Sequence, residues 1–290
     1  MQPKPTFLEL HFAVLLLGAT ALFGKFLTVH PVLIIGGRSL FTVIALIIVM
    51  WILGIGLRIH KRRHMAQLAL SGVLLALHWV AFFTSIQMST VAIGVLGFAT
   101  YPMFVTFLEP ILFKEPLKQS DVFSAIGVMV GIILMVPEWE IGHGQTLALM
   151  IAILSGFLLA CFTIVNRKFV KRHHFLQITF YQHFWAGLCV LPFVFIWSAA
   201  PNMQEWGLLA LLGVVFTALP QALLVHCLSQ IKAQLVSLSV GLEPVYSIVL
   251  AVFLLGEIPP ISVVLGGGII LVSVYFASVV HLRSTNTKRA

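Results

Sequence analysis

One acidic side chain, that of Glu243, falls in the middle of a long apolar stretch and directly precedes Pro244. An ionisable group inside a membrane costs about 2.5–3.5 kcal/mol on insertion scales, so such a group calls for an explanation. The proline removes a backbone donor and loosens the helix at this point. Glu243 could therefore carry protons or hold an ammonium group. The alternative is a protonated acid that ties a kinked helix to its neighbour.

Two tyrosines accompany this acid. Tyr101 directly precedes Pro102, in the same way that Glu243 precedes its own proline. Tyr246 follows Glu243 by three residues and so shares its helix face. An acid and a phenol beside two matched helix kinks predict the centre of a cavity. Aromatic packing where helices cross is the alternative interpretation of both tyrosines.

His78 and Trp79 lie next to each other in another apolar stretch. The histidine could titrate near physiological pH or donate to a substrate carboxylate, and the tryptophan could form an aromatic wall or a face for a cation. A structural histidine that is hydrogen-bonded within the bundle is the alternative. Weaker candidates for the same cavity are Gln182, Gln221 and His226.

Three further charged residues fall inside apolar stretches. Glu109 directly precedes Pro110 and suits a gate or a coupling site as well as a local ion pair. Lys25 and Arg38 fall near the predicted outer ends of the first two apolar stretches, where long side chains reach the membrane surface. For these two we expect anchoring at the interface, with recruitment of an anionic solute as the functional alternative.

These residues are set in a chain that is too apolar for water. Of its 290 residues 60% are hydrophobic and 9% are charged, and the mean hydropathy is +1.08. Soluble domains carry about 25% charged residues. The composition excludes a sizeable water-soluble domain and predicts an all-α membrane protein.

The apolar stretches are long enough to be membrane helices. A spanning helix needs roughly 20 apolar residues at about 1.5 Å rise per residue. On this basis the sequence predicts ten transmembrane helices, at approximately residues 8–29, 32–53, 65–86, 90–113, 122–136, 146–165, 176–197, 206–228, 233–255 and 261–280.

The basic residues test this count. With the N-terminus inside, 15 of the 17 lysines and arginines fall in the predicted inside segments and none in the outside loops. The net charge of +8 is therefore explained by topology, and no nucleic-acid partner is expected. We predict both termini to be cytoplasmic in a bacterial-type inner membrane, with the first stretch kept as a helix rather than cleaved as a signal peptide.

A repeat relates the two halves of the chain. Pro102 is followed 13 residues later by Glu115, and Pro244 is followed 13 residues later by Glu257. The two pairs are 142 residues apart, which also makes Tyr101 the repeat partner of Glu243.

Each half contains five predicted helices. Because five is odd, the second half enters the membrane from the opposite side, as in the inverted repeats of many secondary transporters. The predicted repeat units are residues 1–142 and 143–290.

Several short motifs resemble the EamA-type members of the drug/metabolite transporter superfamily. They are Leu77-His78-Trp79, Phe83-Thr84-Ser85, Leu242-Glu243-Pro244, Leu255-Gly256-Glu257, Gly24-Lys25 and Arg38. The resemblance covers nearly the whole chain as two EamA repeats. It implies a ten-helix transporter of small metabolites, often an exporter of amino acids or related solutes, with a central cavity between the halves.

The sequence thus favours a secondary transporter that exports small metabolites, such as amino acids or related amphipathic solutes, by alternating access, with proton coupling through Glu243. The alternative is an intramembrane lipid-modifying enzyme that uses His78 and Glu243 as acid and base. No enzyme activity, cofactor or metal is expected. The expected partners are a small-molecule solute and the lipid bilayer, and a homodimer through the glycine-rich fifth and tenth helices is left open.

Overall fold

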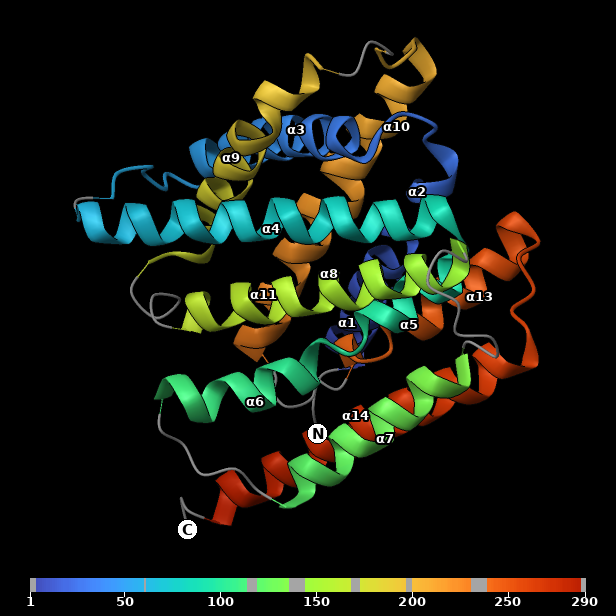
Figure 1. Ribbon diagram of the computed structural model, residues 1–290. Coiled ribbons are helices and arrows are strands. Elements are labelled where there is room, and N and C mark those ends of the chain that lie inside the picture. Colours follow the sequence, from blue (N-terminus) through green and yellow to red (C-terminus); the bar gives the residue numbers. More distant parts are fainter. Residues whose placement is uncertain are drawn as a thin grey trace.

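The computed structural model describes residues 4–59, 61–113, 119–135, 144–167, 173–196, 200–230 and 239–287, which form a bundle of helices with no strand among them (Figure 1). The elements are α1 (Lys4–Thr20), α2 (Phe23–Phe26), α3 (Pro31–Ile52), α4 (Arg62–Met88), α5 (Val91–Phe98), α6 (Tyr101–Phe113), α7 (Gln119–Met135), α8 (Gly144–Arg167), α9 (Phe175–Val194), α10 (Met203–Gly213), the π-helical turn η2 (Val214–Ala218), α11 (Leu219–Gln230), α13 (Glu243–Leu255) and α14 (Ile261–Thr287). The predicted all-helical fold class is confirmed.

The described helices include five segments that are long and apolar enough to cross a membrane, at Leu8–Phe26, Pro31–Ile52, Arg62–Met88, Gly144–Asn166 and Met203–Leu224. Shorter apolar helices accompany them. The predicted fourth span consists of α5 and α6, and the predicted eighth span consists of α10, η2 and α11.

The two matched prolines open helices at equivalent positions of the repeat. Helix α6 begins at Tyr101 and α13 begins at Glu243, so a proline is the second residue of each. Proline is tolerated in the first turn of a helix, where its missing N–H has no intrahelical partner to lose. The sequence predicts kinks within helices at Pro102 and Pro244, whereas the structure begins a new helix at each of these positions, with a polar side chain as its first residue.

Helix packing follows the repeat across the whole bundle. An offset of 142 residues relates α1 to α8, α3 to α9, α4 to α10–α11, α6 to α13 and α7 to α14. Helix α1 packs against α11 and α13, and its counterpart α8 packs against α4 and α6. In the same way α3 packs against α10, and its counterpart α9 packs against α4, which is the counterpart of α10 and α11. The halves thus interlock with pseudo-twofold symmetry, while the bounds 1–142 and 143–290 of the repeat units stay a prediction.

Helices α7 and α14 lie along each other at one side of the bundle (Figure 1). Their backbones approach so closely that a Cβ atom on Gly131 would lie 2.6 Å from the carbonyl oxygen of Gly266. A Cβ on Gly127 would lie 2.1 Å from Oγ of Ser273. Small residues allow such close packing in membranes, so these glycines serve a contact within the chain.

A continuous apolar core occupies one end of the bundle, where α4 and α9 finish and α3, α5 and α8 begin. We call it the Lys25 end, after the lysine in α2. Its buried core includes Phe23, Ile34, Phe83 and Ile93. This packing holds the ends of both halves together on that side.

Candidate functional site

Arg38 of α3 lies inside the bundle, with only 3% of its surface exposed. Its Nε donates a hydrogen bond of 2.8 Å to Oγ1 of Thr217. The carbon of its guanidinium group lies 3.9 Å from the ring centroid of Trp79, which is a cation–π contact. The sequence placed Arg38 at the membrane surface, and that placement is wrong, because packing of α3 against α9 and α10 encloses this side chain.

The π-helical turn η2 holds the partner of Arg38 in place. Thr217 lies in this turn, is fully buried and donates to the carbonyl oxygen of Leu212, five residues earlier, at 2.7 Å. Insertions of this kind inside α-helices occur often at functional sites. Here the wider turn lets one hydroxyl donate to its own helix and accept from the arginine.

Glu243 lies within electrostatic reach of Arg38, although no ion pair joins these two described side chains. Glu243 is the first residue of α13 and keeps part of its surface accessible. Tyr101, at the start of α6, also lies within electrostatic reach of Glu243, and its ring stacks on that of Phe98 at 5.6 Å. The start of α13 therefore lies within electrostatic reach of both Arg38 and the start of α6.

One nitrogen of Arg38, Nη1, is buried and has no hydrogen-bond partner among the described residues. Arginine offers donors in a planar fork that matches a carboxylate. We therefore define the candidate site as Arg38, Trp79, Tyr101 and Glu243, a set with one cation, one acid, one phenol and one aromatic face.

Other predicted residues are engaged in contacts between helices. His78 is buried, and its Nδ1 lies 2.8 Å from Oγ and 3.0 Å from the carbonyl oxygen of Ser155 in α8. Gln182 in α9 donates to Ser71 at 3.0 Å and to Asn166 at 2.8 Å. Both arrangements agree with the structural alternative, since they tie α4, α8 and α9 together.

No described contact joins the side chains of three more predicted residues to this set. The hydroxyl of Tyr246 lies 2.9 Å from Nδ1 of His11 in α1. Lys25 forms an ion pair of 3.5 Å with Glu257. Oε1 of Gln221 is buried without a partner among the described residues. The side chains of Glu109 and His226 fall outside the described residues.

His183 in α9 was missed by the sequence reasoning. It is fully buried, its ring lies 5.1 Å from that of Trp79, and neither ring nitrogen has a hydrogen-bond partner in the described part of the chain. The signal that could have found it is a second polar residue directly after Gln182 in an apolar span.

The model of the EamA-like transporter family matches this chain twice, over residues 8–136 and 146–279. An uncharacterized transporter of Archaeoglobus fulgidus is 26% identical over 197 residues, which are 68% of this chain and 70% of that protein. An S-adenosylmethionine uptake transporter of Rickettsia prowazekii is 24% identical over 220 residues, 76% of this chain and 74% of the relative.

A protein of known crystal structure is similar over 97% of both chains, with a TM-score of 0.66 and 16% sequence identity. At that identity the likeness shows the fold alone. Together with the two family matches it confirms the ten-helix membrane architecture predicted from the apolar stretches.

Proposed function

Since the chain belongs to the EamA-like transporter family, we propose that this integral membrane protein is a secondary transporter that exports small amphipathic metabolites, such as amino acids or related solutes, by alternating access. The family and the names of the relatives indicate a transporter and not an enzyme. The lipid-modifying alternative therefore loses its support.

The observation that carries this substrate class is the presence of both a cation and an acid in the candidate site. An amino acid presents a carboxylate and an ammonium group a few ångströms apart. The unpartnered Nη1 of Arg38 suits the carboxylate, and the partly accessible Glu243 suits the ammonium group. S-adenosylmethionine, which the rickettsial relative is named for, also carries both groups.

Alternating access is supported by the interlocked repeat. Glu243 and Tyr101 stand at the starts of equivalent half-helices, one from each half. Rocking of one half against the other would change their separation without unfolding either helix. In transporters with inverted repeats, the substrate site lies near the midplane where the halves meet.

Solute flux into proteoliposomes tests this proposal. Purified protein should exchange labelled amino acids or their derivatives across the membrane at a rate well above that of empty vesicles. Because the rickettsial relative is named for uptake, the experiment should impose gradients in both directions. A protein that moves no solute from a broad panel of zwitterions would contradict the proposal.

We also propose that Glu243 couples transport to protons. In the variant Glu243→Gln, the side chain keeps its shape but can neither bind nor release a proton. A pH gradient should then no longer drive accumulation, while exchange at equal pH persists at a reduced rate. The matched control is Glu205→Gln, because Glu205 caps α10 and accepts from Thr28 away from Arg38. Unchanged pH-driven accumulation in Glu243→Gln would remove the coupling role.

The proposed location is a bacterial-type inner membrane with both termini cytoplasmic, which is supported by the one-sided distribution of lysines and arginines. A homodimer stays a prediction. Of the glycines that suggested it, Gly131 on α7 and Gly266 on α14 pack against each other within one chain.

A further inference from the structure

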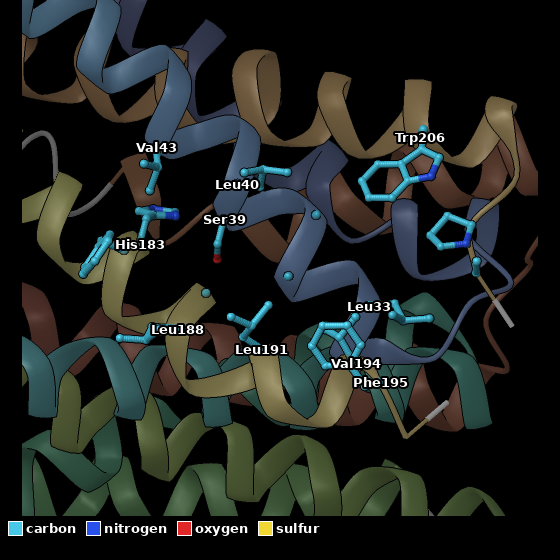
Figure 2. A pocket seen from close by; sticks show the side chains of 16 residues that line it. Leu33, Ser39, Leu40, Val43, His183, Leu188, Leu191, Val194, Phe195 and Trp206 are labelled. Carbon is cyan, nitrogen blue, oxygen red and sulfur yellow. The ribbon is translucent and has the colours of Figure 1, made fainter. Parts of the chain in front are cut away.

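A groove with a volume of about 690 Å³ runs between α3 and α9 and reaches the start of α10 (Figure 2). One end, at the Lys25 end of the bundle, is lined by Leu33, Val194 and Trp206. The other end lies deeper along both helices, at Val43 and His183. Most of its lining is apolar, and its size suits one small organic molecule.

Two polar groups stand at the deep end of this groove. Ser39 and His183 come from facing helices, line the groove and are almost completely buried. Oγ of Ser39 and both ring nitrogens of His183 have no hydrogen-bond partner among the described residues. Buried polar groups in proteins are nearly always hydrogen-bonded, so these atoms suggest a partner that enters through the groove.

The deep end of the groove shares a wall with the candidate site. The ring of His183 lies 5.1 Å from that of Trp79. Trp79 also contacts the guanidinium group of Arg38, whose carbon lies 3.9 Å from the ring centroid. The contact between His183 and Trp79 therefore joins the groove to the charged site.

We infer that this groove binds the apolar part of an amphipathic solute, whose hydrogen-bonding end contacts Ser39 and His183. A lipid acyl chain fits the walls but would place hydrocarbon against three unsatisfied polar atoms. A wholly polar solute would form hydrogen bonds with those atoms but would make no favourable contact with the apolar walls. This inference deepens the proposed function and rests on it, because the same solute would be the one exchanged with the Arg38 site.

The lining also offers a variant that fills the groove. A Cβ atom on Gly36 would lie 3.4 Å from Cγ2 of Val194, which is an ordinary contact. Gly36→Leu should therefore fold and occupy the groove with its side chain. The matched control is Gly268→Leu on α14, since a Cβ there meets no atom within 4 Å.

Photolabelling of the purified full-length protein tests the inference. The probe is a ten-carbon chain that carries a diazirine in its middle and an uncharged primary amide at one end. A second probe has a methyl group in place of the amide. Peptides of α3 and α9 that line the groove should be labelled about tenfold more by the amide probe, because only the amide can pair with the buried polar atoms.

Three variants complete the test. Gly36→Leu should abolish labelling of these peptides and Gly268→Leu should not. Ser39→Ala keeps the shape of the groove, so it should reduce labelling by the amide probe and leave the methyl probe unchanged. Equal labelling by both probes, unaffected by Ser39→Ala, would mean that only lipid chains occupy the groove and would overturn the inference.

Binding and transport fail separately in this design. Labelling requires no flux, so groove labelling in a protein without transport would overturn the proposed function alone. Transport of zwitterions by a protein whose groove is not labelled would overturn the groove inference alone.

Discussion

At the scale of single residues, the few polar groups inside the bundle fall into two classes. Some of them bond to each other between helices, as His78 does with Ser155. Others keep an atom without a partner in the described chain, as Arg38 and His183 do. An unpaired buried polar group costs about 1–3 kcal/mol, more if charged. We therefore expect substitutions in the first group to affect stability and those in the second to affect transport.

The variant Arg38→Lys tests the second group. Lysine keeps the positive charge but loses the planar stack on Trp79 and the Nε hydrogen bond to Thr217. A desolvated cation–π contact is worth about 2 kcal/mol, so we expect kcat/KM for solute exchange to fall about 30-fold. Thr217→Ser keeps the hydroxyl and should transport at nearly the normal rate. Normal exchange by Arg38→Lys would show that the guanidinium geometry is not needed.

The variant Ser155→Ala tests the first group. It removes the hydroxyl that pairs with His78, so the free energy of unfolding should fall by about 1–3 kcal/mol. The melting temperature of the purified protein in detergent measures this loss of stability. KM for solute should stay unchanged, since the pair lies between α4 and α8. A raised KM with normal melting would instead assign His78 to the substrate site.

At the scale of elements, helix interruptions decide where side chains point. Helices α6 and α13 start at equivalent residues because each has a proline in its first turn. The π-turn η2 sits in the repeat counterpart of the uninterrupted α4, so it breaks the symmetry of the two halves. It does so where Thr217 meets Arg38. The asymmetric element thus supplies the partner of Arg38, while the symmetric starts of α6 and α13 supply Tyr101 and Glu243.

Gly131→Leu tests the scaffold contact between α7 and α14. A Cβ on Gly131 would meet the backbone of α14 at 2.6 Å, and backbone cannot yield as a flexible side chain can. Overpacking of this kind costs about 1–3 kcal/mol, so the melting temperature should fall. Gly268→Leu on the open side of α14 is the control and should melt normally. Equal melting of both variants would contradict the close packing.

At the scale of the whole molecule, the Lys25 end is closed. Its apolar core is continuous. An ion pair and hydrogen bonds also connect the helix ends at this side of the bundle. Glu257 pairs with Lys25 at 3.5 Å and accepts from the backbone N–H of Val91 at 2.8 Å. Lys25 also donates to the carbonyl oxygen of Ser89. These contacts join α2, α5 and the end of α13, so alternating access requires them to separate.

Cysteine accessibility measures this closure. Leu27→Cys, in a chain whose three native cysteines are replaced by serine, introduces a thiol at a position that is 1% exposed at the Lys25 end. A polar maleimide should label it slowly. The double variant Lys25→Gln and Glu257→Gln removes the ion pair between these side chains. The free energy that favours the closed state should fall by about 1 kcal/mol, so labelling should accelerate about fivefold. An unchanged rate would mean that apolar packing alone holds this end shut.

The sequence by itself determined the membrane class, the predicted spans and the equivalent positions of Pro102 and Pro244 in the two halves. Apolar content, proline position and a 142-residue repeat are local or periodic signals that need no knowledge of contacts. Tertiary structure decided that Arg38 turns inward and that His78 is bonded to Ser155. It also brought His183 and Ser39 to one groove. These outcomes depend on which helix faces which, and hydrophobic periodicity does not specify that within a bundle whose helices are apolar on every side.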